Sequence, residues 1–208
     1  KMKIHFNKYT SKKISVIRNP ATFSEYPKRT KRNTTPLNIV YLGSFQNWHL
    51  PNETIKIIKD LSYISKIPIK VTVITGDKFL ANTYFKHIKI NGSIEIKSMS
   101  YSLIPNELSK NDIGFCLIKP TFSKSVCMPV KFNEYLAAGV YVVVNKNIGD
   151  LEEITNGSNG IVLDDPNNTE NAKLIWEKYS SKIDFEKIPE DLFWDKKGLS
   201  NLVELYNL

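Results

Sequence analysis

Six short hydrophobic runs, rich in valine and isoleucine, alternate with helix-like segments from residue 39 onward. The runs have the length of strands and are apolar throughout, which is typical of strands buried on both faces of a sheet. Strands that alternate with helices favour a parallel sheet covered by helices on both sides. The sequence therefore predicts a doubly wound, mostly parallel α/β domain. Its strands are expected at residues 39–42, 69–75, 94–96, 113–118, 140–144 and 160–163.

The segments between these runs predict the helices of the same domain. Residues 50–64 place Ile55, Ile58, Leu61 and Ile64 on one helix face. Further helices are expected at residues 78–87, 103–109, 129–139, 149–155 and 169–179.

The two ends of the chain do not follow this alternation. Residues 1–35 hold a strand-like run at 14–17 and a basic cluster at 28–32. Residues 36–192 form the predicted domain. Residues 193–208 predict a closing amphipathic helix, because Leu199, Leu202, Val203 and Tyr206 form an apolar stripe.

Composition limits the function classes. The 208 residues are 41% hydrophobic and 24% charged, as in ordinary globular domains, and the apolar runs are too short to span a bilayer. The start of the chain lacks the apolar core of a signal peptide. Cys116 and Cys127 are interpreted as free thiols in a reducing cytosol, because two cysteines make neither a disulfide scaffold nor a metal site. We therefore expect a cytoplasmic protein.

The net charge of +8 favours anionic partners. A nucleoside diphosphate, an acidic membrane surface and nucleic acid all carry the required charge. No aromatic RNA-binding motif or helix-turn-helix pattern accompanies the basic residues, so nucleic acid is not expected. Peripheral contact with a membrane stays open.

Residues 129–139, Pro-Val-Lys-Phe-Asn-Glu-Tyr-Leu-Ala-Ala-Gly, are the most informative local stretch. They place Lys131 and Glu134 one turn apart at the start of a helix. In open α/β sheets, ligands bind where helix starts face the carboxyl ends of the strands. A lysine can neutralise a phosphate there, and a carboxylate can accept hydrogen bonds from sugar hydroxyls.

Several pieces follow one another in a recognisable order. They are Ser-Val-Ile-Arg-Asn-Pro at 15–20, Ile-Val-Tyr-Leu-Gly-Ser at 39–44, the segments 94–100 and 111–114, the stretch 129–140, Gly-Asp-Leu-Glu-Glu-Ile at 149–154, 159–163, and Phe-Trp at 193–194 before the last helix. The ordered set resembles the C-terminal half of a GT-B glycosyltransferase of the large retaining family 4, or group 1. The resemblance covers nearly the whole chain.

This resemblance implies a Rossmann-like, nucleotide-sugar-binding domain, with residues 1–35 as an interdomain segment and remnant of an N-terminal domain. The reaction implied is transfer of a sugar, with retention, from a nucleoside diphosphate sugar to a glycan or lipid-linked acceptor. No metal or other cofactor is implied. The acceptor is expected to be a bacterial surface glycan precursor. An N-terminal domain is the expected partner, and peripheral contact with the inner membrane face stays open. The isolated chain is expected to bind nucleotide and to catalyse little.

The resemblance also implies the donor-binding residues. Glu134 would bind the ribose and Lys131 the diphosphate, while the tight turn of Gly43 and Ser44 approaches a phosphate. Further contacts are expected from Ser98 and Ser100 at the base pocket, and from Ser125, Cys127 and Met128 at the donor sugar.

The sequence departs from the family pattern at two points. The family's first loop glutamate falls at Val126, and the basic pair that often follows the first-strand glycine is missing after Gly43. A non-catalytic nucleotide-sugar-binding module is therefore the alternative. A nicotinamide-binding protein is disfavoured, because no Gly-x-Gly-x-x-Gly follows a strand.

Three nearby residues have no clear role in this pattern. Trp48 either stacks on a ligand or packs against the following helix, and nothing favours His49 as a catalytic base. Asp150 is interpreted as a helix cap. No catalytic residue is assigned.

Overall fold

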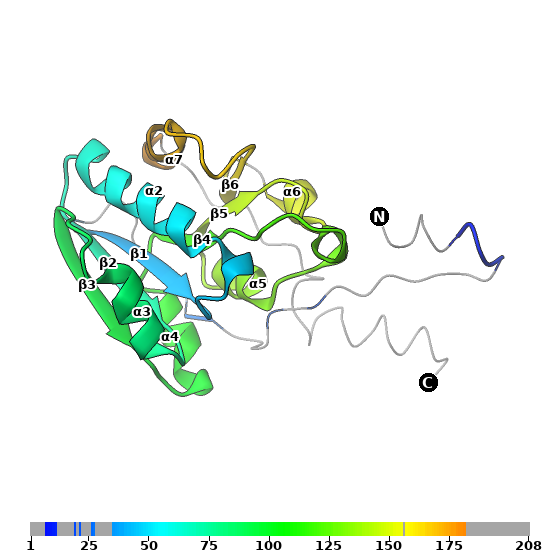
Figure 1. Cartoon of the computed structure of the whole chain (residues 1–208), viewed down its shortest axis with the longest axis horizontal. Helices are drawn as coiled ribbons and strands as arrows, with labels where there is room; N and C mark the ends of the chain where they lie inside the picture. The colour runs from blue at the N-terminus through cyan, green and yellow to red at the C-terminus, as the bar shows by residue number, and fades with distance from the viewer. Residues whose placement is uncertain are drawn as a thin grey trace.

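The computed structural model describes residues 7–11, 19, 21, 26–27, 35–155 and 157–181. Within them, six parallel strands form one sheet in the spatial order β3-β2-β1-β4-β5-β6 (Figure 1). The strands are β1 (Leu37–Leu42), β2 (Ile69–Ile74), β3 (Gly92–Lys97), β4 (Ile113–Cys116), β5 (Tyr141–Asn145) and β6 (Gly160–Leu163). The predicted parallel α/β architecture is confirmed.

Helices cover both faces of this sheet. They are α2 (Pro51–Ile64), α3 (Lys78–Phe85), α4 (Ile104–Leu108), α5 (Val130–Ala137), α6 (Leu151–Ile154) and α7 (Asn171–Ser180), with 3-10 turns η1 (Asn47–His49), η2 (Tyr101–Leu103) and η3 (Ser123–Val126). Side chains of α2, α3 and α7 contribute to one hydrophobic core, and those of α4, α5 and α6 to a second core. The domain is therefore doubly wound.

The central strands are apolar throughout because both of their faces are buried. In β1, Ile39 and Tyr41 belong to the first core, whereas Val40 and Leu42 belong to the second. Successive side chains of a strand point to opposite faces, so each core receives every second residue. This explains why the hydrophobic runs predicted strands of a covered, parallel sheet.

The strand order reverses direction between β1 and β4. Strand β1 pairs with β2 on one side and with β4 on the other, so the connections leave it in both directions. Such a reversal leaves a crevice at the carboxyl ends of the two strands, where ligands of open α/β sheets bind.

Some predicted boundaries were wrong for identifiable reasons. Strand β4 ends at Cys116, because Ile118 bonds to a side chain: its N–H donates to Asn145 Oδ1 (2.8 Å), and its carbonyl accepts from Asn145 Nδ2 (2.9 Å). Strand β3 is longer than expected, because it pairs with β2 along its whole length. The helix expected at 103–109 is divided into η2 and α4, with Pro105 in the first turn of α4, where proline is favoured.

Some predictions lie outside the described residues, namely the strand at 14–17, the basic cluster at 28–32 and the closing helix at 193–206. Both cysteines are free thiols, as predicted, with Cys116 buried and Cys127 partly exposed. No helix in the described ranges is long and apolar enough to cross a membrane.

Candidate functional site

All of the predicted site residues lie at the carboxyl edge of the sheet. Gly43 and Ser44 follow β1, and Ser98 and Ser100 follow β3. Ser125, Cys127 and Met128 lie between β4 and α5, and α5 itself carries Lys131 and Glu134. The fold thus gathers residues from positions 43 to 134 at one edge, beside the crevice between β1 and β4.

Gly43 forms the turn at the end of β1. Its φ of +128° is a conformation that side-chain-bearing residues rarely adopt, and its N–H donates to the carbonyl of Ile74 (3.0 Å). A Cβ placed on Gly43 would lie 3.9 Å from Lys131 Nζ and 3.9 Å from His49 Cε1. The turn therefore leaves a small space bordered by an ammonium group and an imidazole ring.

Lys131 brings a buried cation to this space. Its Nζ is buried and has no hydrogen-bond partner among the described residues, although the rest of the side chain is partly exposed. The ammonium lies 5.2 Å from the centre of the Tyr41 ring. Burial lowers the pKa of Lys131, and the Cys116 thiol opposes this shift. A buried cation without a hydrogen-bond acceptor is costly, so the site favours an anion.

His49 is held by the same turn. Its Nδ1 lies 2.8 Å from the carbonyl oxygen of Ser44, which also accepts from the Tyr41 hydroxyl (2.6 Å). Burial lowers the pKa of His49 to about 4, and the positive charges of Lys131 and Lys124 contribute to this shift. The ring is therefore neutral near pH 7, and its place beside Lys131 was not predicted from the sequence.

Glu134 is enclosed by the fold. The residue is only 2% exposed, because α5 packs against the second core. Its Oε1 accepts a hydrogen bond of 2.5 Å from the Tyr101 hydroxyl. Burial raises the pKa of Glu134, and the Tyr101 bond partly offsets that rise.

Tyr101 belongs to the segment predicted to edge the base pocket, but its bond to Glu134 was not predicted from the sequence. It begins η2, directly after the predicted base-pocket residues Ser98 and Ser100, which are both exposed. The tyrosine is 46% exposed although its hydroxyl reaches the buried Glu134. The signal in the sequence was its position in a loop at the carboxyl edge, because binding residues often lie on such loops.

The loop between β4 and α5 is held by its own hydrogen bonds. The Ser125 hydroxyl donates to the Phe122 carbonyl (2.7 Å), and its N–H donates to Thr121 (3.0 Å). The Cys127 N–H donates to the Lys124 carbonyl (3.1 Å). These groups already have acceptors, so the structure shows no free donor at Ser125 or at the Cys127 amide.

Two other parts of the chain, Gly149 and Asn19, contact this loop. The Gly149 N–H donates to the carbonyl of Lys124 (3.1 Å), and a Cβ on Gly149 would lie only 2.0 Å from the Cys127 carbonyl oxygen. The Met128 carbonyl accepts from the Asn19 side chain (3.2 Å). The predicted sugar-binding loop is thus packed against Gly149, which lies directly before α6. Asp150 occupies the N-cap position of α6, as predicted, without a side-chain capping bond.

The loops after β1 and β4 are joined across the crevice. The Lys119 N–H donates to the Trp48 carbonyl (2.8 Å), and Lys124 Nζ lies 5.6 Å from the centre of the Trp48 ring. Trp48 is 44% exposed, so it is not a core residue. The positive charges of Lys124 in η3 and Lys131 in α5 thus both act on His49.

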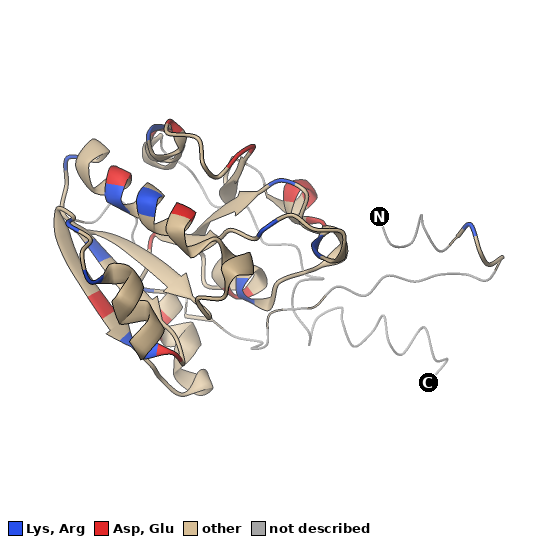
Figure 2. Cartoon of the chain, viewed as in Figure 1, with Lys and Arg blue, Asp and Glu red and all other residues tan. Residues whose placement is uncertain are grey.

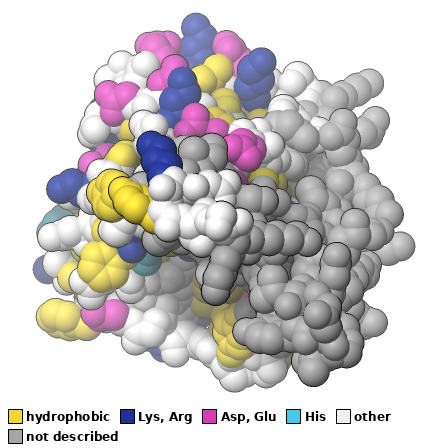
Figure 3. Space-filling model, turned by 90° about the vertical axis from the view of Figure 1, so that its right-hand side faces the viewer, with side chains coloured by type: hydrophobic (Ala, Val, Ile, Leu, Met, Phe, Trp, Pro, Cys, Tyr) yellow, Lys and Arg dark blue, Asp and Glu magenta, His cyan; other side chains and the backbone are white. Residues whose placement is uncertain are grey.

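The charges elsewhere on the described surface are mixed. Helix α2 carries both acidic and basic residues, namely Glu53, Lys56, Lys59 and Asp60 (Figure 2). On the face that β1 points toward, hydrophobic and basic side chains lie next to one another in the described part (Figure 3). The described residues contain no group of three or more His, Cys, Asp or Glu able to hold a metal ion.

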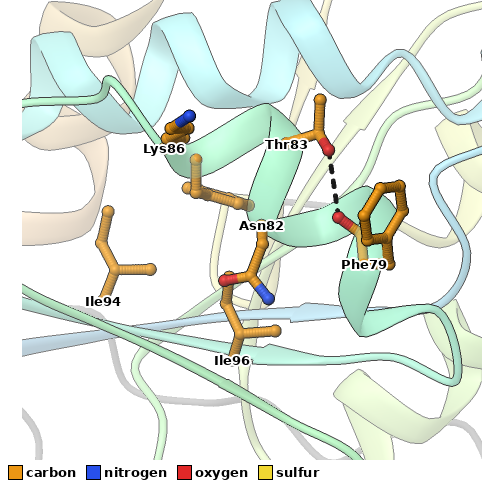
Figure 4. A pocket seen from close by; sticks show the side chains of 7 residues that line it. Phe79, Asn82, Thr83, Lys86, Ile94 and Ile96 are labelled. Atoms are coloured by element: carbon orange, nitrogen blue, oxygen red, sulfur yellow. Dashed lines mark hydrogen bonds between the residues drawn. The ribbon is translucent and has the colours of Figure 1, made fainter.

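A hollow of about 530 Å³ lies elsewhere, between α3 and β3 (Figure 4). Its lining is mostly apolar and includes Phe79, Phe85, Ile94 and Ile96. It holds none of the predicted site residues.

The fold matches GT-B glycosyltransferase domains, as predicted. The lipopolysaccharide outer core galactosyltransferase WaaB, in its apo form, aligns with a TM-score of 0.69 at 13% identity over 98% of this chain and 58% of that protein. The C-terminal domain of LpcC, a glycosyl transferase group 1 family protein from Francisella tularensis, aligns at 0.53 and 16% identity, over 91% and 96%. HepE of Anabaena, in complex with UDP-glucose, aligns at 0.54 and 12% identity, over 83% and 49%.

At these identities the likeness establishes the fold alone. The chain spans about half to three fifths of the length of WaaB and HepE. The sequence matches no protein-family model and no curated protein sequence.

Proposed function

We propose that this domain binds a nucleoside diphosphate sugar at the carboxyl ends of β1 and β4, as the donor-binding part of a glycosyltransferase. The observation that carries the proposal is the buried ammonium of Lys131. It has no hydrogen-bond partner among the described residues and borders the space above Gly43. A diphosphate in that space supplies the anionic acceptor that Lys131 lacks.

Glu134 complements this charge one turn further along α5. Its carboxylate bonds to one hydroxyl, that of Tyr101, in the structure. A ribose diol offers two hydroxyl donors and replaces Tyr101 at the carboxylate, which requires the Tyr101 side chain to move aside. The exposed tyrosine ring then lies near the nucleobase. The two residues of α5 thus recognise the diphosphate and the ribose of one ligand.

The proposed chemistry is departure of a nucleoside diphosphate from the donor sugar. Negative charge develops on the leaving diphosphate, and Lys131 stabilises it in a water-poor setting where electrostatic interactions are strong. Protein cations provide this stabilisation in place of a metal ion. We further propose transfer with retention to a glycan or lipid-linked acceptor of the bacterial surface, held by a preceding domain. The lipopolysaccharide role of WaaB supports the acceptor class.

Calorimetric titration with UDP-glucose, GDP-mannose and ADP-glucose tests donor binding. Lys131→Ala should weaken binding of the preferred nucleotide sugar far more than binding of its bare nucleoside, and the difference should shrink with added salt. Lys173→Ala, an exposed lysine of α7, is the matched control. Absence of binding to all three donors, or equal losses for nucleotide sugar and nucleoside in Lys131→Ala, would contradict the proposal.

A non-catalytic nucleotide-sugar-binding module is the second candidate function, and Val126 is the residue that favours it. It stands where the resembling family has its first glutamate, and it is 39% exposed without a hydrogen-bonding side chain. A turnover assay on the full-length protein separates the two functions, because a binding module would retain donor affinity without transferring sugar.

A further inference from the structure

We propose that His49 is a second phosphate-binding residue of the donor site, and that it takes up one proton from solvent when a nucleoside diphosphate sugar binds. This inference rests on the proposed function. The added cation is the imidazolium of His49. The ring is neutral in the free domain and becomes protonated when the ligand binds.

The geometry places His49 and Lys131 around one point. His49 Cε1 and Lys131 Nζ each lie 3.9 Å from the position of a Cβ on Gly43, and glycine leaves that position empty. A phosphate oxygen above Gly43 is therefore close to both groups. Nε2 is bonded to Cε1, so it lies one bond from the ring atom that borders this position.

The hydrogen bond of Nδ1 determines the tautomer. His49 Nδ1 lies 2.8 Å from the Ser44 carbonyl oxygen, which only accepts, and 3.3 Å from the Ser44 hydroxyl, which can donate or accept. We assign the proton to Nδ1 because the shorter contact requires a donor there. In the neutral ring, Nε2 then presents a lone pair, which repels an anionic phosphate oxygen. His49 can donate a hydrogen bond to phosphate only if Nε2 gains a proton, so formation of this hydrogen bond and proton uptake are the same event.

The surroundings explain why this proton is absent before the ligand binds. Lys131 of α5 and Lys124 of η3 both disfavour a positive charge on His49, as does burial. The other titratable group at the turn is Tyr41 of β1, whose hydroxyl shares the Ser44 carbonyl with His49. A bound diphosphate neutralises the lysines and adds an acceptor, which reverses the electrostatic cost of the imidazolium.

Calorimetry with UDP-glucose tests this inference cleanly, because a diphosphate diester has no group that titrates near neutral pH. Binding is measured at pH 6 and pH 8, in pairs of buffers with different ionisation enthalpies. If the pKa of bound His49 returns to about 6.5, the domain takes up about 0.75 proton per ligand at pH 6 and almost none at pH 8. GDP-mannose or ADP-glucose replaces UDP-glucose if one of them is the ligand that binds.

The matched variant is His49→Asn, whose amide can donate to the Ser44 carbonyl but has nothing in place of Nε2. It should bind without proton uptake at pH 6. The wild-type advantage over this variant should grow about fourfold from pH 8 to pH 6, by proton linkage. Taking this ratio removes pH effects of Glu134 and Lys131, which both proteins share.

Two results would overturn the inference while donor binding stands. One is binding by the wild type with equal enthalpies in both buffers at pH 6, and the other is undiminished proton uptake in His49→Asn. Failure of every nucleotide sugar to bind would overturn the proposed function together with this inference.

Discussion

At the residue scale, Lys131 is a group whose burial opposes folding. An ammonium removed from water without a hydrogen-bond acceptor destabilises the folded state, and the Tyr41 ring compensates only in part. Residues of this kind are typical of binding sites, where a ligand supplies the missing partner.

Lys131→Met should therefore stabilise the free domain while removing donor affinity. The apolar side chain keeps the packing of the lysine stem, and we expect a gain of about 1 kcal/mol in the free energy of unfolding. Urea denaturation of both proteins without ligand measures the gain. A less stable Lys131→Met domain would show that the ammonium has a stabilising partner in the fold.

Glu134 makes a second prediction at this scale, concerning pH. Because the pKa of its carboxyl is raised in the folded state, the folded protein binds a proton more readily than the unfolded chain. The carboxylate therefore destabilises the fold as pH rises above about 4.3, the ordinary pKa of glutamate, and this loss is complete above the raised folded pKa.

Glu134→Gln has no charge to bury and still accepts a hydrogen bond from Tyr101. Its stability relative to the wild type should increase as pH rises from 4 to 7, which denaturation curves at the two pH values would show. A constant difference across this range would mean that Glu134 titrates alike in both states.

At the element scale, the loop between β4 and α5 depends on the start of α6. Gly149 has a φ of +44°, and any Cβ there would overlap the Cys127 carbonyl oxygen. The two backbone segments lie so close together that only glycine fits at position 149. This contact joins the start of α6 to a loop that carries three of the predicted site residues.

Gly149→Ala should shift this loop and weaken both the fold and donor binding. We expect a loss of about 2 kcal/mol or more in stability, from backbone strain and steric overlap. Gly157→Ala is the control, since nothing lies within 4 Å of a Cβ at that position. Thermal unfolding and donor titration of both variants provide the comparison, and equal behaviour would show that the loop adapts without cost.

At the scale of the whole molecule, the site lies at one open edge of the sheet. The proposed donor-binding residues include residues of the turn after β1 and of α5, and no acceptor site is proposed among the described residues. The chain also spans only 58% of WaaB. This partial coverage supports the proposal that the domain acts together with another part of a longer enzyme.

We expect this 208-residue chain to bind nucleotide sugar without transferring it, and its natural preceding sequence to restore transfer. Closure of two domains would complete the site and exclude water from the reacting sugar. A radiolabelled-donor assay on both proteins tests this expectation. Robust transfer by the 208-residue chain would place the acceptor site within these residues.

Local sequence pattern was sufficient to predict the fold class and the edge of the sheet that carries the site. Hydrophobic periodicity reports which faces of a strand or helix are buried, and it is contained within a few neighbouring residues. The positions of Gly43, Lys131 and Glu134 followed from this reasoning, because parallel strands bring their carboxyl ends to one edge.

The chemical state of the site followed from contacts between distant segments. Three contacts are examples. Lys131 Nζ is buried without a hydrogen-bond partner in the described part of the chain, the Tyr101 hydroxyl donates to Glu134, and His49 Nδ1 lies against the Ser44 carbonyl. No local pattern encodes these contacts, because desolvation and hydrogen-bond geometry depend on what other parts of the chain place within a few ångströms. For that reason the sequence predicted the edge of the sheet at which we propose that a ligand binds, whereas the burial, hydrogen bonds and charges of the groups there depend on the assembled fold.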